Sequence, residues 1–277
     1  MKSFGRILLV FLLVWCAART AVFLLPGDPV DFLVHDSLVQ VDPALLRSRM
    51  DLDGSPWSRL FSLPRNQSLI RSETAAVLMK SAVLHTGVLG LLSVLLAIPL
   101  TFLLLFLDFR RNGESTISAW ASITLASAPV FVTGPILLWL LPIPNPILPA
   151  LVLALHLTAV WHRALSARIR QLLPSSSVPG ARALGFGEIR VFYKNLLAPA
   201  LGTFLVFFGS QVGTLLNGSL LVEILFHWNG LGNLIAESVL SRDYPLIEIG
   251  IMVAAFFSLL AQQLGYAAQK WWDPTVK

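Results

Sequence analysis

The chain has 277 residues, of which 56% are hydrophobic and 13% are charged, and its net charge is +5. Soluble domains carry about 25% charged residues, so this composition, with a mean hydropathy of +0.75, indicates a membrane protein instead. A nucleic-acid-binding role is not indicated, because the basic residues lie between apolar runs and do not form one basic face. The single cysteine, Cys16, excludes an intrachain disulfide.

The first apolar run, Ile7–Leu25, is long enough to span a hydrocarbon core and follows Lys2 and Arg6. A cleaved signal peptide is the alternative interpretation, since such peptides also begin with a basic region before an apolar core. Residues 17–19 form a poor cleavage site, however, because the apolar run resumes after Arg19. We therefore predict that residues 1–25 form a retained first transmembrane helix.

Residues 26–80 form a polar, proline-bearing segment that contains six aspartates and no evident core of its own. We expect this segment on the extracytoplasmic side, with short amphipathic helices such as "PALLRSRM" at 43–50.

Five further apolar segments complete a predicted six-helix membrane protein, with residues 81–277 forming a five-helix core. Prolines within these segments are tolerated when neighbouring helices satisfy the freed carbonyls. The segments cover residues 81–107, 116–141, 147–161, 196–221 and 246–268.

The distribution of Lys and Arg predicts the orientation of these spans. Basic pairs or clusters occupy the short loops after the second and fourth spans, at Arg110–Arg111 and at 163–170. Most basic residues on the opposite side lie in the long segment 26–80, where the positive-inside rule is weak. The short loops therefore predict that both termini face the cytoplasm.

Few ionisable residues lie deep in the apolar segments. His85, His156 and Glu248 are the candidates, and an ionisable group within a membrane is by default a functional hypothesis. We interpret His156 as a helix-packing residue and place Glu248 near the outer interface. No HExxH, GxSxG or P-loop motif is present, so an intramembrane enzyme is disfavoured, and energy for any transport must come from another subunit or an ion gradient.

The loop between the fourth and fifth spans contains "PGARALGFGEIRVFYKN", at 179–195. The pattern predicts a helix, a break at Gly185 and Gly187, where positive φ is possible, and a second helix. Residues 189, 192 and 193 have the spacing of one helical face. This face fits either docking into a partner's cleft or packing against the chain's own helices.

Several stretches resemble a known family. "ARALGFGEIRVFYKNLLAPAL" looks like the coupling segment of binding-protein-dependent ABC importer permeases. Four others resemble the first permease subunit of the dipeptide/oligopeptide/nickel family: "LLPGDPV" at 24–30, "SAPVF" at 127–131, "NGSLLVEILFHWNGLGNLIAESVLSRDYPLIEIG" at 217–250 and the terminal "WDPTVK".

This resemblance implies an all-α, polytopic type I ABC permease fold in a bacterial cytoplasmic (inner) membrane, with a coupling loop at 162–196. The implied function is a non-catalytic subunit of an ATP-driven importer for di- and oligopeptides. Nickel chelates or glutathione-like solutes are alternative cargoes, and a non-transporting membrane anchor or sensor is an alternative of a different class. The implied partners are a second homologous permease, two ATP-binding subunits, an extracytoplasmic solute-binding protein and the lipid bilayer. No cofactor is expected on this chain, since the partner subunits would use the ATP and Mg²⁺.

The resemblance also implies two sets of site residues. Those expected to couple to the ATPase are Ala181, Arg182, Ala183, Gly185, Phe186, Gly187, Glu188, Arg190 and Phe192. Those expected at the mouth of the translocation pathway are Glu223, Trp228, Gly230, Gly232, Arg242, Asp243 and Tyr244, with Glu223 and Arg242 as a possible exposed ion pair.

The coupling segment departs from the family pattern at Pro179–Gly180 and at Leu184, which takes a place often held by lysine. Pro179 disfavours helix at Val178, and Gly180 weakens the start of the coupling helix.

Overall fold

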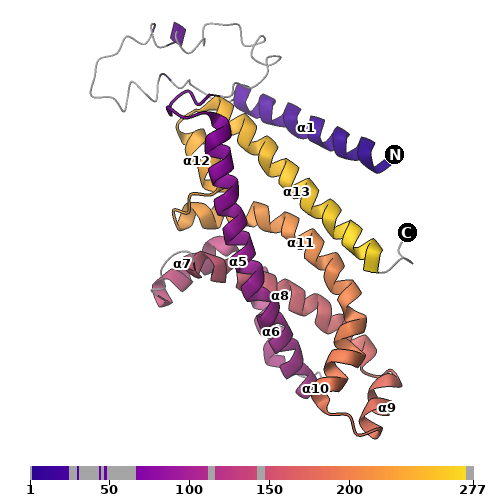
Figure 1. Cartoon of the computed structure of the whole chain (residues 1–277). Helices are drawn as coiled ribbons and strands as arrows, with labels where there is room; N and C mark the ends of the chain where they lie inside the picture. Colours follow the sequence, from indigo (N-terminus) through magenta and orange to yellow (C-terminus); the bar gives the residue numbers. More distant parts are fainter. Residues whose placement is uncertain are drawn as a thin grey trace. The chain divides into compact units, whose positions relative to one another are not determined.

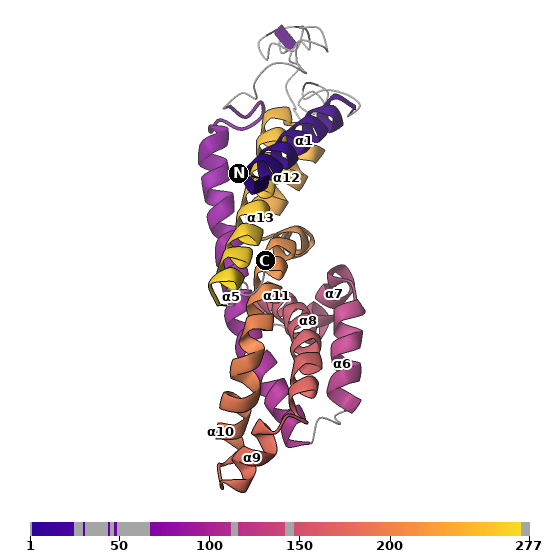
Figure 2. The ribbon, with the colours of Figure 1, turned by 90° about the vertical axis from the view of Figure 1, so that its right-hand side faces the viewer.

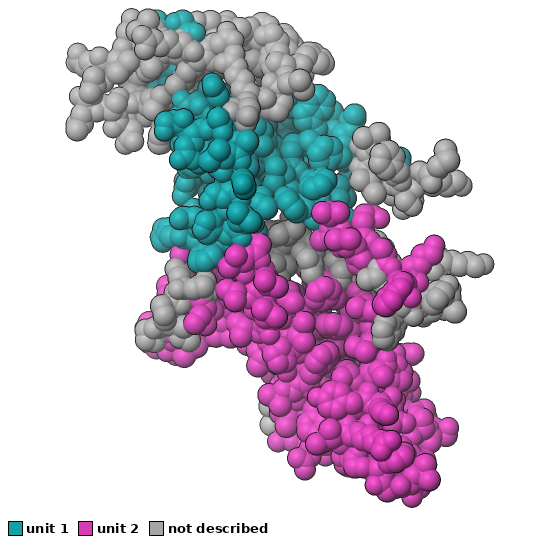
Figure 3. Space-filling view, viewed as in Figure 1, with its two compact units in different colours: residues 1–86, 227–259 teal, residues 87–226, 260–277 magenta. Residues whose placement is uncertain are grey.

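The computed structural model is all-helical in the part of the chain that it describes, which is residues 2–24, 67–111, 116–141 and 147–272 with positions 30, 44, 47 and 48 (Figure 1). Most of the expected helix at 43–50, most of "LLPGDPV" and the last five residues of "WDPTVK" lie outside the described residues. The helices form two compact units, residues 1–86 with 227–259 and residues 87–226 with 260–277 (Figure 3).

Unit 1 contains α1 (Lys2–Leu24), the start of α5 (Ala75–Arg110), α12 (Leu231–Leu240) and most of α13 (Tyr244–Trp272). Its core joins one face of α5 to α12 and to the start of α13. The buried side chains of this core are Ala75, Met79, Ala82, Leu231, Leu234 and Leu246.

Helices α12 and α13 also approach closely at Gly250. A Cβ atom on Gly250 would lie 2.6 Å from Cγ1 of Ile235 in α12, much closer than non-bonded carbons pack. The absence of a side chain at this position therefore allows the two helices to pack.

Unit 2 contains the rest of α5 with α6 (Thr116–Ser127), α7 (Val130–Leu140), α8 (Ile147–Leu172) and α11 (Ala198–Leu225). Figure 2 shows α6 lying beside α8. Aromatic rings hold the interior together: Trp161 of α8 packs on Phe204 and Phe208 of α11, with ring centroids 5.3 and 5.6 Å apart.

Within the described ranges, three helices are long and apolar enough to cross a membrane: Ala75–Arg110, Ile147–Leu172 and Tyr244–Gly265. A fourth span is counted if the bent pair Ser118–Ser127 and Val130–Leu140 is one crossing. The six spans and their orientation therefore stay predictions.

The third predicted segment, 116–141, is not one straight helix. It divides into α6 and α7, which meet at an angle of 112°. The break lies at Ala128–Pro129, because proline has no N–H to donate and disfavours helical geometry at the preceding residue. The fourth predicted segment, 147–161, forms a longer helix than expected. Helix α8 continues beyond Trp161 to Leu172 and so includes Arg163, Arg168 and Arg170.

Candidate functional site

The predicted coupling segment folds as helix, break and helix, as expected. Helix α9 covers Ser177–Ala183 and α10 begins at Glu188. Between them the N–H of Phe186 donates to the carbonyl of Ala181 and the N–H of Gly185 to that of Arg182, which is the Schellman pattern of helix ends. Gly185 has φ +77° and provides the left-handed residue that this motif requires.

The predicted effect of Pro179 on the preceding residue was wrong. Helix α9 includes both Val178 and Pro179, and the amide of Gly180 donates to the carbonyl of Ser176 over 3.1 Å. The helix tolerates this proline because Pro179 lies in its first turn, where backbone N–H groups have no intrahelical partner. Gly187 has φ −64° and precedes α10 in an extended conformation, so only Gly185 uses positive φ.

Charged side chains stabilise the turn between α9 and α10. The Nε and Nη2 atoms of Arg182 each lie 3.0 Å from one carboxylate oxygen of Glu188, which is a bidentate arrangement. The same guanidinium lies over the ring of Phe109 at the end of α5, 5.4 Å from its centroid. Arg190 lies over Phe186, 4.0 Å from the ring centroid. These contacts link the turn to the α5 end and to α10.

The surface of this turn is strongly apolar. Leu184 is 75% exposed, Ile189 63% and Tyr193 52%, and Phe186 is also exposed. Ala183 lies on this exposed segment, whereas Ala181 is buried against the unit 2 core. A cluster of exposed large apolar side chains is typical of a surface that binds a partner.

The spacing predicted that Phe192 shares one helical face with Ile189 and Tyr193, and this was wrong, because those two side chains are exposed and Phe192 is not. It is fully buried and packs against Phe106 and Phe109, with ring centroids 5.4 and 5.5 Å apart. Residues 192–197 form a π-helix, η1, between α10 and α11, so the α-helical spacing used for the prediction does not apply there. The side-chain amide of Asn195 donates to the carbonyl of Ser177 over 3.1 Å and ties η1 to α9.

Six of the seven predicted mouth residues lie in unit 1, around α12. The indole Nε1 of Trp228 donates to the carbonyl of His85 over 3.0 Å, and the amide of Leu231 donates to the hydroxyl of Thr86 over 2.8 Å. Gly230 immediately precedes α12, and Gly232 is buried in its first turn. These bonds fix the entry of α12 against α5.

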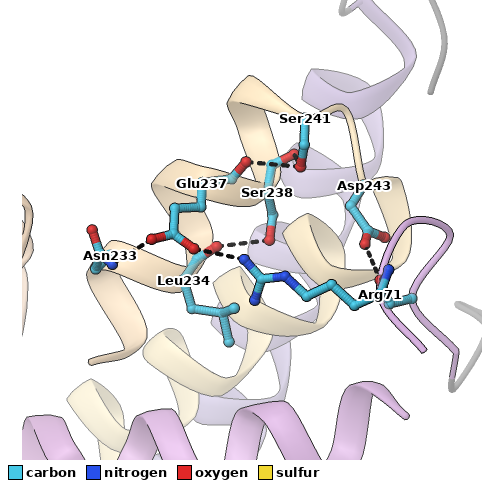
Figure 4. A network of polar contacts seen from close by, with 8 residues as sticks. Arg71, Asn233, Leu234, Glu237, Ser238, Ser241 and Asp243 are labelled. Atoms are coloured by element: carbon cyan, nitrogen blue, oxygen red, sulfur yellow. Dashed lines mark hydrogen bonds and ion pairs between the residues drawn. The ribbon is translucent and has the colours of Figure 1, made fainter. Parts of the chain in front are cut away.

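The end of α12 is held by a second set of polar contacts (Figure 4). Buried Asp243 accepts hydrogen bonds from the hydroxyl of Ser68 and from the amide of Leu69, the latter at 3.2 Å. Arg71 forms an ion pair of 2.6 Å with Glu237, whose other carboxylate oxygen accepts from Asn233 over 2.7 Å. Residues 68–71 are thereby attached to α12 and to the turn that follows it.

Arg242 occupies an unusual backbone position in that turn. It has φ +60°, and the amide of Asp243 donates to the carbonyl of Ser238 in a second Schellman arrangement. Tyr244 then begins α13 with Pro245 in its first turn, a position that suits proline.

Glu223, the seventh predicted mouth residue, does not lie at an exposed position. It lies in α11 of unit 2 and is fully buried, so the prediction of an exposed ion pair with Arg242 was wrong about its exposure.

Sequence reasoning missed two polar contacts between helices. In unit 1, Arg19 of α1 lies 3.4 Å from Glu248 of α13, and both side chains are buried. In unit 2, Asp108 accepts from Ser118 over 2.5 Å and lies 2.8 Å from Nε2 of His162. The signal for the first was present in the sequence: each partner is an ionisable residue in an otherwise apolar span, and such residues usually pair.

The sequence profile described as "Binding-protein-dependent transport system inner membrane component" matches residues 114–277. That range includes the whole coupling segment and all seven predicted mouth residues. The chain belongs to this family. It is a non-catalytic permease subunit of an ABC importer and an inner-membrane component, and its importer class works with ATPase and solute-binding-protein partners.

Two kinds of curated permease are similar to the chain. The nickel import system permease NikB of Staphylococcus aureus strain RF122 is 26% identical over 292 residues, covering 94% of this chain and 87% of that protein. The di/tripeptide permease DppB of Pseudomonas aeruginosa strain UCBPP-PA14 is 39% identical over 114 residues, covering 41% of this chain and 34% of that protein. Both similarities confirm the family that the sequence motifs indicated.

Proposed function

We propose that this permease forms half of the channel of an ATP-driven importer for nickel chelates. The observation that carries the proposal is the similarity to NikB, which extends over 94% of the chain. The sequence alone led us to rank peptides first and nickel chelates second, and this similarity reverses that order. Peptides remain the second candidate, because the similarity to DppB is higher in identity over a shorter part of the chain.

In the proposed complex, a second homologous permease completes the channel, two ATP-binding subunits dock on the cytoplasmic side and an extracytoplasmic protein delivers the cargo. The chain itself crosses the membrane six times with both termini in the cytoplasm. The basic residues at the ends of α5 and α8 support this orientation. No cofactor is bound by this subunit.

The coupling segment, α9 to α10, is the proposed contact with one ATP-binding subunit. Its exposed apolar residues Leu184, Ile189 and Tyr193 supply area to bury against a partner. The Arg182–Glu188 pair and the Schellman turn keep this surface in one conformation, which lowers the entropy that binding would cost.

The residues around α12 are the proposed extracytoplasmic mouth. Asp243 and Glu237 fasten residues 68–71 to α12 and to the turn after it, so these four residues are anchored where a solute-binding protein would release its cargo.

Uptake by cells that lack their own nickel and peptide importers tests the cargo. The chain is expressed with its partner subunits, and accumulation of radiolabelled nickel, added with histidine as chelator, is compared with accumulation of a radiolabelled dipeptide. We expect nickel uptake that is lost when this chain is omitted, and no gain in dipeptide uptake. Dipeptide uptake without nickel uptake would establish the second candidate, and uptake of neither would support a non-transporting anchor.

Co-purification tests the docking surface independently of the cargo. Replacement of residues 181–194 by a Gly/Ser linker should abolish recovery of the ATP-binding subunit while the second permease is still recovered. Retained recovery of the ATP-binding subunit would place its docking site elsewhere.

A further inference from the structure

Unit 2 contains a cavity of about 280 Å³ between the end of α5, the start of α6 and the last turns of α8. Its wall is partly apolar, formed by residues such as Leu105, Ile123 and Leu173. Its polar lining consists of Asp108, Ser122, His162, Arg163, Ser166 and Arg170. None of these residues belongs to the coupling segment, α9 to α10, or to the proposed mouth, and those from residue 162 onward lie in the predicted coupling loop before that segment.

Two arginines give the cavity a positive rim. Arg163 and Arg170 are seven residues apart on α8, which places them on the same face two turns apart. Both side chains are exposed. Within the described ranges neither guanidinium has a hydrogen-bond or ion-pair partner, in contrast to Arg168 on the same helix, whose Nη1 donates to Gln171 over 3.2 Å.

The one acidic residue of the cavity is already engaged. One carboxylate oxygen of Asp108 accepts from the hydroxyl of Ser118, and the other lies 2.8 Å from Nε2 of His162. A carboxylate only accepts hydrogen bonds, so Nε2 carries the proton of that bond. The lining therefore retains one net positive charge from its two arginines and one aspartate.

The position of the proton on Nε2 of His162 also determines whether the Ser166 hydroxyl donates or accepts a hydrogen bond there. The hydroxyl oxygen of Ser166 lies 3.2 Å from the same Nε2, and since that nitrogen donates, the oxygen must accept. The hydroxyl proton of Ser166 then has no acceptor within the described ranges, although the side chain is buried. The cavity lining thus includes one unused hydroxyl donor and two unused guanidinium groups.

We propose that this cavity binds a phosphate group, held by Arg163 and Arg170 and accepting a hydrogen bond from Ser166. A phosphodiester carries one negative charge, which matches the net charge of the lining. The ends of α5 and α8 also carry Arg110, Arg111 and Arg168, and basic pockets between helices at the cytoplasmic interface bind lipid headgroups. The apolar wall fits the start of an acyl chain, so the headgroup of an anionic glycerophospholipid is one source of the phosphate and free phosphate is the other.

The test uses the full chain assembled with its partner subunits in nanodiscs of phosphatidylcholine containing a minor fraction of phosphatidylglycerol. Native mass spectrometry then counts the phosphatidylglycerol molecules retained by the complex. We expect retention to fall at least about tenfold in Arg163→Gln and in Arg170→Gln, because each loses a charge-assisted bond. Ser166→Ala should fall by about threefold to tenfold, because it loses a single hydroxyl donor.

Arg168→Gln is the matched control, since it removes the same charge from the same helix outside the cavity. It should retain phosphatidylglycerol as the unaltered chain does. Equal losses in Arg168→Gln and Arg163→Gln would overturn the proposal, because they would show only a general attraction of the surface. Ser166→Ala keeps every charge, so it still tests the cavity if an arginine variant fails to assemble.

A second arm distinguishes the sources of the phosphate. Inorganic phosphate and glycerol phosphate are added to nanodiscs of phosphatidylcholine alone, and the thermal unfolding midpoint is measured. A rise that Arg163→Gln abolishes, without selective retention of phosphatidylglycerol, supports the site and assigns it to free phosphate. No response to either soluble phosphate or phosphatidylglycerol would refute it.

Discussion

The guanidinium of Arg19 and the carboxylate of Glu248 lie 3.4 Å apart and join α1 to α13, with only 5% and 10% of their side chains exposed. Arg19 also lies over the ring of Trp15, 5.6 Å from its centroid. Two opposite charges in an apolar bundle are tolerable as a pair, whereas one alone is expensive. The pair therefore specifies which face of α1 packs against α13.

We expect either single substitution, Arg19→Met or Glu248→Leu, to lower the free energy of unfolding by about 3–5 kcal/mol, because each leaves one buried charge without its partner. The double variant removes both charges and should recover most of that loss. Unfolding of the detergent-solubilised chain by sodium dodecyl sulfate measures all four proteins. Additive losses in the double variant would show that the two residues act independently.

Asp243→Ala should weaken the attachment of residues 68–71 by freeing Ser68 and Leu69, while the ion pair between Arg71 and Glu237 remains. The change removes the acceptor of the Ser68 hydroxyl and the Leu69 amide, and a lost acceptor at a buried site costs about 1–3 kcal/mol. Trypsin cleavage after Arg71 should become faster, as followed by gel electrophoresis. Ser241→Ala is the control, since the half-buried hydroxyl of Ser241 bonds, among the described residues, only to carbonyls of its own helix. Equal cleavage rates in the two variants would contradict the anchoring role of Asp243.

Gly185→Val should uncouple ATP hydrolysis from uptake while leaving membrane insertion intact. Valine at φ +77° is strained by roughly 1–2 kcal/mol, so the α9–α10 turn would open and displace the exposed apolar residues. Transport and ATPase rates of reconstituted complexes measure the ratio of solute moved to ATP hydrolysed. Gly87→Val is the control, because Gly87 is helical in α5, lies outside the coupling segment and has no atom within 4 Å of its Cβ position. An unchanged ratio in Gly185→Val would remove the coupling role from this turn.

Gly250→Ala should force α12 away from α13. The new Cβ would lie 2.6 Å from Cγ1 of Ile235, and overpacking of this kind costs about 1–3 kcal/mol. A second substitution, Ile235→Ala, removes the obstructing atom and should restore part of the loss. The unfolding midpoint checks both, with Gly87→Ala as the control because its Cβ position is open. A midpoint unchanged by Gly250→Ala would mean that the two helices are free to separate at no cost.

The sequence predicted those features that depend on neighbouring residues along the chain. The helix, glycine break and helix of the coupling segment follow from local conformational preference. Composition likewise indicated a membrane protein, and short motifs indicated its family, which the profile match confirms.

Features that depend on packing between distant segments were not predictable in the same way. The bend between α6 and α7 needs Pro129, but other prolines, such as Pro99 in α5, lie within continuous helices. The partners of Arg19, Asp108 and Asp243 come from remote parts of the chain. The burial of Phe192 depended on a π-helical turn that no spacing rule anticipates.

That π-turn, residues 192–197, lies between the exposed apolar turn with α10 on one side and the long helix α11 on the other. In a π-helix the backbone hydrogen bonds join residues five apart, whereas in an α-helix they join residues four apart. Each π-turn therefore contains more residues than an α-helical turn. If one residue moved from the π-turn into a neighbouring helix, α10 and α11 would rotate relative to each other by about 100° and shift along the helix axis by about 1.5 Å. The hydrogen bond from Asn195 to the carbonyl of Ser177 would restrain that movement. A force on α10 would therefore be transmitted to α11 as a combined rotation and translation, so the exposed turn and α11 need not move as one rigid body.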